Sequence, residues 1–358
     1  MRREGTMTAD ISLSEPTRIL IFLSGIIIVL AGMKAAAPII APIAFSVFLA
    51  VIFGMLLYWL EKKGLSRRLA LLATLVIFFS IIAVFIVVIA GAVFRIVSEI
   101  PGYQAELENS LEMLAADLGL VEFDPAWISL PQIIRFLESS TSGLAGDLLD
   151  IVGITIVIIL TTVFLILEAR GFSAKIKGII AEYRPRDLDR FTLLARRNVD
   201  YIIIRTAVNL VMGIGTAILL ALIGVEYAVF WGFLAFLLGF IPYVGFWLAV
   251  LPPTLLAWFQ LGPLAAIAVI AGCGVINVLV EYVLFPNIAG RSLSLSPAVV
   301  FLSLIFWGWI LGGIGVLIAV PLTLAVQMVC ELFDETRWIA TLLGPSPKDD
   351  LVIPAKGQ

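Results

Sequence analysis

Between Glu226 and Glu281 the chain reads YAVFWGFLAFLLGFIPYVGFWLAVLPPTLLAWFQLGPLAAIAVIAGCGVINVLV, a run of 54 residues without a charged side chain. One helix of that length would measure about 80 Å, well over twice the ~30 Å hydrocarbon core of a bilayer. Because proline removes a helical hydrogen bond, the run should bend where proline and glycine gather. Those places are GFIPYVG (Gly239 to Gly245), Pro252-Pro253 and Gly262-Pro263.

A second uncharged run of 39 residues lies between Arg291 and Glu331. It is interrupted by Gly308, Gly312, Gly313 and Gly315, and it carries Pro321 further on. Each long run therefore predicts two apolar arms around a break. The arms are either spanning pairs or re-entrant hairpins, because both arrangements return the chain to the same side of the membrane.

The composition of the whole chain agrees with a membrane protein. Of its 358 residues 61% are hydrophobic and 14% charged, and the mean hydropathy is +1.12. A soluble domain is typically ~45–50% apolar and ~25% charged. We therefore predict an all-α, polytopic membrane protein with about eight transmembrane helices, including the two Gly/Pro-broken hairpins, and a small helical extracytoplasmic region.

Several classes of chemistry are excluded or disfavoured. The chain has no histidine, and Cys273 and Cys330 stand alone in apolar stretches, so no metal site, cofactor or disulfide is expected. No GxSxG, Walker A or HExxH motif occurs, so we expect no enzyme and no self-contained ATP-driven pump. The net charge of −3 indicates no nucleic-acid partner.

Five shorter charge-free stretches predict further spans, and the charges between them predict their orientation. The loop EKKGLSRR (Glu61 to Arg68) holds four bases and one acid, and residues 168–205 hold nine bases and five acids. Residues 95–150 hold ten acids and only two bases. Since Lys and Arg gather on the cytoplasmic side, the first two regions should face inward and the third outward.

This orientation predicts the following division of the chain. Residues 1–18 form a cytoplasmic tail, 19–94 transmembrane helices 1–3, 95–150 an acidic extracytoplasmic helical region and 151–167 transmembrane helix 4. Residues 168–205 form a basic cytoplasmic amphipathic region, 206–330 a transmembrane transport core with two broken hairpins, and 331–358 a cytoplasmic tail. A cleaved signal peptide is disfavoured because apolar sequence resumes at Pro38.

Ionisable residues inside membrane segments are costly and mark functional sites. Glu281 is the leading candidate, with Asn277 one helical turn earlier. Glu281 either binds a proton, a cation or a polar solute, or lies near the cytoplasmic end of its helix and meets water or Arg291. Arg205 and Asn209 repeat the same spacing, and there we favour an arginine that extends toward the membrane surface.

Two blocks resemble the autoinducer-2 exporter (AI-2E, PerM-like) family of bacterial permeases. The first is GVEYAVFWGFLAFLLGFIPYVG, from Gly224 to Gly245. The second runs from Asn277 to Thr323 and includes WGW-x-LG and VPLT. The resemblance extends over nearly the whole chain, while the spacing around Glu281 differs by about one residue from the family pattern.

The resemblance implies an inner-membrane permease of roughly eight spans, assembled as a homo-oligomer that resembles a pentamer. Some members are linked to export of a furanosyl quorum-sensing signal, and others to sodium/proton exchange. Together with the broken segments and the ionisable residues, the resemblance predicts a substrate or ion pathway. Its residues are Pro242, Tyr243, Gly245, Asn277, Glu281, Gly290, Arg291, Gly308, Gly312 and Gly315.

Three functions stay open from the sequence. The first is a secondary transporter that exports a small polar solute, with autoinducer-2 as a candidate, by a hairpin-based alternating-access mechanism. The second is a sodium/proton antiporter that uses Glu281, and the third a non-transporting oligomeric membrane scaffold. The expected partners are the solute, a proton or sodium ion, membrane lipids and further copies of the chain. The expected location is the bacterial inner membrane, with both termini cytoplasmic.

Overall fold

A computed structural model of the chain describes residues 14–84, 86–87, 91, 130–183, 188–289 and 295–344. Within these ranges the regular structure is entirely helical, as the sequence predicts. The elements, in chain order, are α1 (Glu15–Ala35), α2 (Ala37–Lys62), the helix Arg67–Val84, α4 (Leu130–Tyr183), α5 (Leu188–Ile223), α6 (Ala228–Leu238), α7 (Gly245–Leu261), α8 (Pro263–Val278), the π-helix η3 (Leu279–Leu284), α9 (Phe285–Ala289), α10 (Pro297–Leu317), α11 (Ala319–Leu332), η4 (Asp334–Thr336) and α12 (Arg337–Leu343).

Six helices in the described part of the chain are long and apolar enough to cross a membrane. They are Ala37–Lys62, Arg67–Val84, Val152–Ala169 within α4, Leu188–Ile223, Pro263–Ile288 and Pro297–Leu317. Four apolar helices of 10–17 residues accompany them: Leu20–Ala35, Ala228–Leu238, Gly245–Leu261 and Ala319–Leu332. The protein is therefore a multi-span helical membrane protein, while the count of eight spans stays a prediction.

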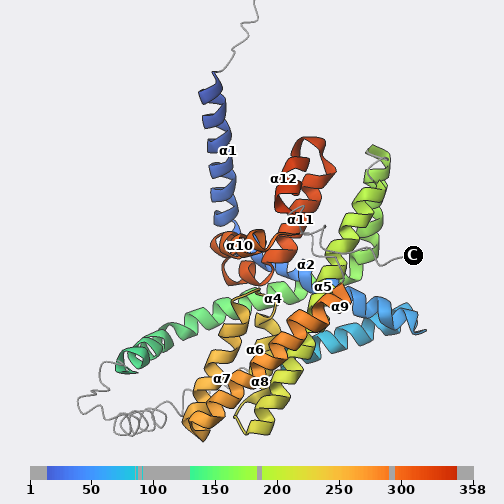
Figure 1. Cartoon of the computed structure of the whole chain (residues 1–358). Coiled ribbons are helices and arrows are strands. Elements are labelled where there is room, and N and C mark those ends of the chain that lie inside the picture. Colours follow the sequence, from blue (N-terminus) through green and yellow to red (C-terminus); the bar gives the residue numbers. More distant parts are fainter. Residues whose placement is uncertain are drawn as a thin grey trace, which may run out of the picture.

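Helix α5 is the central element, since α2, α6, α8, η3, α9 and α11 all pack against it. Figure 1 shows α6, α7 and α8 gathered beside the last part of α5, α10 to α12 at the other end, and α1 standing clear of the bundle. Glycines let α5 and α6 approach closely, because a Cβ on Gly213 would lie 2.7 Å from the carbonyl oxygen of Gly232. Small residues serve the same purpose in other membrane helix pairs.

Both long uncharged runs break where the sequence predicts. Between α6 and α7 the chain turns through Gly239 to Val244, with Tyr243 at a φ of 66°. In α10 the helix is interrupted at Gly312, whose φ of 68° and ψ of −151° favour glycine. After each break a glycine packs against the preceding arm, Gly245 on the carbonyl of Leu238 and Gly315 on the carbonyl of Trp307.

Two details of the first run differ from the expectation. Pro252 and Pro253 lie inside α7 without breaking it, and the next turn comes at Gly262, with a φ of 88°. The following apolar helix is not α-helical throughout, because Leu279–Leu284 forms a π-helix between α8 and α9. A π-helix is rare, occurs mostly as a single turn that absorbs an extra residue within an α-helix, and is frequently found at functional sites.

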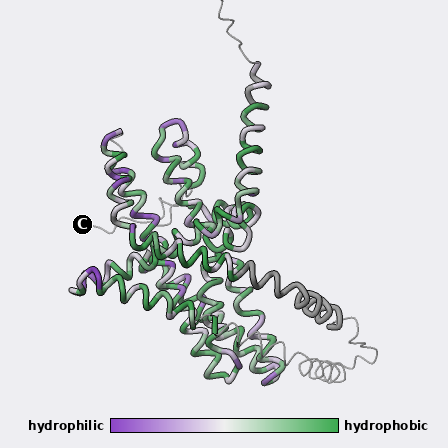
Figure 2. Tube along the Cα trace, turned by 180° about the vertical axis from the view of Figure 1, so that it is seen from behind, coloured by the Kyte–Doolittle hydropathy of each residue, from purple (hydrophilic) through white to green (hydrophobic). Residues whose placement is uncertain are grey.

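Polar residues gather toward the ends of the long helices. Figure 2 shows hydrophilic residues at the tips of the long helices, while the middle of the bundle is mainly hydrophobic. Helix α4 runs unbroken for 54 residues, from Leu130 in the predicted acidic region to Tyr183 in the predicted basic region. The remainder of the predicted acidic region lies largely outside the described residues, and the proposed boundaries stay predictions.

The close approach at the first break predicts an intolerance of side chains there. A Cβ at Gly245 would overlap the carbonyl of Leu238, so Gly245→Ala should lower the free energy of unfolding by at least about 1–3 kcal/mol. Denaturant unfolding of the purified protein in detergent measures this change. Gly274→Ala in α8 is the matched control, because a Cβ there meets nothing within 4 Å. Equal stability of the two variants would contradict the proposed packing.

Candidate functional site

A buried ion pair joins α5 to the π-helix. Arg205 Nη1 lies 2.9 Å from both carboxylate oxygens of Glu281, and the arginine side chain is only 7% exposed. Two further ion pairs between described residues, Lys175–Glu168 and Arg337–Asp334, lie on the surface. Charges removed from water are costly unless they are paired and hydrogen-bonded. The pair therefore marks this place in the structure as a candidate functional site.

The same arginine also holds the first break. Arg205 Nε donates a hydrogen bond of 3.0 Å to the carbonyl oxygen of Gly239, and Nη2 donates to the same oxygen. Gly239 directly follows α6, where the last carbonyls of a helix have no partner within the helix and carry its partial negative charge. One guanidinium thus links three elements: α5, the turn between α6 and α7, and η3.

Apolar and aromatic residues surround this link. The guanidinium lies 5.4 Å from the ring centre of Phe285, and the surrounding cluster includes Tyr201, Phe240 and Val280. Phe240 also packs edge-on against Phe48 of α2, with ring centres 5.2 Å apart. An apolar environment strengthens the attraction between charges by lowering the local dielectric constant. The side chain of Glu281 is 26% exposed, so it is less deeply buried than its partner.

Asn209 lies one turn beyond Arg205 on α5 and is completely buried. Neither its Oδ1 nor its Nδ2 has a hydrogen-bond partner among the residues that the structure describes. A buried amide in this condition costs about 1–3 kcal/mol. The candidate site therefore contains both a satisfied charge pair and an unsatisfied polar group, on neighbouring turns of one helix.

The structure brings some of the predicted site residues together and separates others. Pro242 and Tyr243 lie in the turn whose first residue, Gly239, accepts hydrogen bonds from Arg205, and Gly245 begins α7 directly after that turn. Asn277 is half-buried on α8 and makes no hydrogen bond to Glu281 among the described residues. Gly290 and Arg291 lie outside the described residues.

Gly308, Gly312 and Gly315 belong to the second break, which contacts the first through an apolar cluster. Ile241 of the first turn shares this cluster with Leu304, Trp307 and Ile310 of α10. Trp307 Nε1 in turn donates a hydrogen bond of 2.9 Å to Thr323 Oγ1, which fastens α10 to α11. The two breaks are therefore neighbours in space although some 70 residues separate Pro242 from Gly312.

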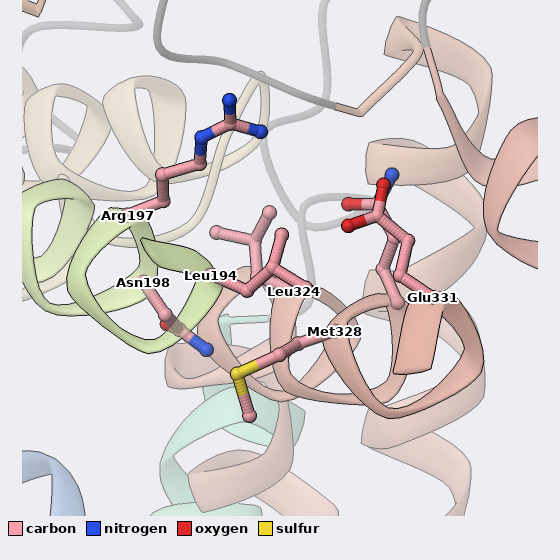
Figure 3. A pocket seen from close by; sticks show the side chains of 7 residues that line it. Leu194, Arg197, Asn198, Leu324, Met328 and Glu331 are labelled. Carbon is pink, nitrogen blue, oxygen red and sulfur yellow. The ribbon is translucent and has the colours of Figure 1, made fainter. Parts of the chain in front are cut away.

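A small pocket lies apart from the ion pair, between the first turns of α5 and the end of α11. Figure 3 shows Arg197 and Glu331 on opposite sides of its apolar floor. Its walls are completed by Leu194, Asn198, Leu324, Gln327 and Met328. Asn198 precedes Arg205 by two helical turns, so the pocket opens on the same face of α5 as the candidate site.

The interpretation of Arg205 from sequence is wrong. An arginine near the start of a predicted span is expected to extend toward the membrane surface, but Arg205 lies well inside the 36-residue helix α5 and points into the protein. For Glu281 the structure adds a partner that the sequence does not identify, because its carboxylate binds Arg205. A contact with Arg291 stays a prediction, since Arg291 lies outside the described residues. The spacing of Arg205 and Asn209 within an otherwise apolar stretch is the signal that could have identified the site.

A multi-span helical bundle with two contacting breaks and a buried charge pair has the features of a membrane transport protein. The chain belongs to the AI-2E family of transporters, because the sequence model of that family matches residues 21–334. It is 30% identical to the AI-2 transport protein TqsA of Escherichia coli K12, over 93% of this chain and 97% of TqsA.

Further relatives have less specific names. YhhT of the same strain, named as a candidate transport protein, is 29% identical over 93% of this chain and 96% of its own. A candidate transport protein of Haemophilus influenzae is 31% identical over 91% of this chain and 96% of its own. The resemblance seen in the sequence is therefore confirmed, and the family is one of transporters.

The ion pair predicts a strong energetic coupling between its two members. Arg205→Met alone leaves Glu281 buried without a counter-ion and should cost about 3–5 kcal/mol of unfolding free energy. The double variant R205M/E281M removes both charges and should recover much of that loss. A double-mutant cycle of denaturant unfolding in detergent measures the coupling. Additive effects of the two substitutions would show that the charges do not interact.

Proposed function

We propose that the protein is a secondary transporter that exports a small polar solute by moving its broken hairpins relative to α5. The observation that carries the proposal is the double attachment of Arg205, to Glu281 and to the carbonyl of Gly239. A solute that competes for Arg205 or Glu281 would also change the attachment of the hairpin. Solute binding and hairpin movement are thereby coupled through one side chain.

The contact between the two breaks supports a joint movement. Ile241 of the first turn packs with Leu304 and Trp307 of α10, so a displacement of one break displaces its neighbour. Broken helices near the membrane midplane are typical of secondary transporters, because their unwound backbone offers free N–H and C=O groups to a substrate. Pro242, Tyr243, Gly245, Gly308, Gly312 and Gly315 would form this part of the pathway.

Autoinducer-2 is the solute to test first, since TqsA is named as its transport protein. The second candidate function is sodium/proton antiport by Glu281, which the partial exposure of its side chain favours. A cation would then have to replace the guanidinium of Arg205 at that carboxylate. In both schemes Glu281 is needed, with Asn277 on the same helix and Arg291 and Gly290 following it.

Transport into inverted membrane vesicles tests the proposal. The wild-type protein should accumulate autoinducer-2, and Pro242→Ala, Gly312→Leu and Glu281→Gln should each abolish accumulation because they alter the breaks or the ion pair. Gly274→Ala should leave it unchanged. Normal accumulation in the Pro242 and Gly312 variants would refute a hairpin mechanism. Cation-dependent proton movement that Glu281→Gln removes, without solute movement, would favour antiport, and no movement of either would favour a scaffold.

We further propose that the protein lies in the bacterial inner membrane as a homo-oligomer with cytoplasmic termini. The basic Glu61 to Arg68 loop supports the orientation, and the family resemblance supports the assembly. Native mass spectrometry from mild detergent should give about five copies of the 38.8 kDa chain, the number that the family resemblance implies. A monomeric mass under conditions that preserve transport would overturn this assembly.

A further inference from the structure

Asn209 is the polar residue that the proposed transport site does not yet use. Its side chain has no exposed surface, and both polar atoms of its amide lack a hydrogen-bond partner within the described part of the chain. Thr206, on the same helix, shows the ordinary arrangement: its hydroxyl donates a hydrogen bond of 2.7 Å to the carbonyl of Ile202. Asn209 makes no such bond to its own helix, so it needs another explanation.

The amide lies against the residue that Arg205 holds. A Cβ placed on Gly239 would be 2.8 Å from Asn209 Cγ, 2.8 Å from Oδ1 and 3.0 Å from Nδ2. Only a glycine fits at this distance. Arg205 and Asn209, one turn apart on α5, therefore both face Gly239, but only Arg205 donates to its carbonyl oxygen.

We propose that Asn209 is a positioning residue, which donates from Nδ2 to the carbonyl oxygen of Gly239 whenever Arg205 releases that oxygen. This inference rests on the proposed function, in which a solute or ion competes for Arg205 and Glu281. Without a replacement donor, the buried carbonyl oxygen of Gly239 would lose its hydrogen bonds from Arg205. Such a loss would oppose release of the hairpin, since an unpaired buried carbonyl is strongly disfavoured.

A role in packing alone does not account for an asparagine here. Leucine has a similar volume and would fill the space without burying two unpaired polar atoms. Consecutive turns of a helix are about 5.4 Å apart, so a shift of the hairpin by one turn or less exchanges the two donors. Asn209 would thus stabilise the hairpin in the position reached after Arg205 has released Gly239. In the position in which Arg205 binds Gly239, the unpaired amide of Asn209 is destabilising.

Thermal unfolding of the purified protein tests the inference without any transport assay. Asn209→Leu should leave the unfolding midpoint unchanged or raise it when Arg205 is present, because it removes an unpaired amide. In the R205M background the same substitution should lower the midpoint, because Asn209 is then the donor to Gly239. Thr206→Val is the matched control and should have the same effect in both backgrounds.

The sign of the effect decides the outcome. If Asn209→Leu shifts the midpoint in the same direction in both backgrounds, Asn209 is not an alternative donor and the inference is overturned. Should R205M fail to fold, R205M/E281M provides a background without an unpaired charge, and the same change of sign is expected there.

Transport provides the second readout. Asn209→Leu should reduce the rate of autoinducer-2 accumulation in inverted vesicles roughly tenfold, the effect of one buried hydrogen bond on a transition. Thr206→Val should retain the wild-type rate. A wild-type rate in Asn209→Leu would overturn the inference. If the wild-type protein moves no solute, the proposed transport function fails, and the unfolding experiment still decides the role of Asn209.

Discussion

The organisation of the bundle depends on one buried guanidinium. Arg205 must place its positive charge in an apolar interior, and Glu281 and the carbonyl of Gly239 are the groups that compensate it. Because these partners come from η3 and from the turn after α6, their positions relative to α5 are fixed together. A charge that is expensive to bury thus determines how three separate parts of the chain meet.

The helical membrane fold follows from the sequence with little ambiguity. Hydrocarbon forces every backbone group to pair internally, so long apolar runs predict helices, and runs too long for the bilayer predict breaks. GFIPYVG and Gly312 are such breaks. Pro252 and Pro253 were a false signal, because a membrane helix can retain proline when its neighbours pack around it.

The site was harder to predict. Glu281 stands out in the sequence because any acid in an apolar run does, whereas its partner lies 76 residues away on another helix. Whether two residues so far apart in the sequence form a pair depends on how α5 and α8 pack. The sequence pattern of each helix does not give that packing. Asn209 is recognisable in the sequence as a polar residue within an apolar stretch. Its lack of a partner among the described residues and its contact with Gly239 are properties of the packed structure.

The π-helix at Leu279–Leu284 determines where this span can change in length. A π-turn absorbs one extra residue within an α-helix, so a one-residue deletion there is accommodated by restoring regular α-helix. Each residue of an α-helix turns the chain by about 100°, so the same deletion within α8 would rotate everything beyond it by that angle. Glu281 and the apolar residues around Phe285 would then face away from Arg205. A change of one residue in length is therefore tolerated at the π-helix, whereas elsewhere in this span it would change which side chains enter the interior.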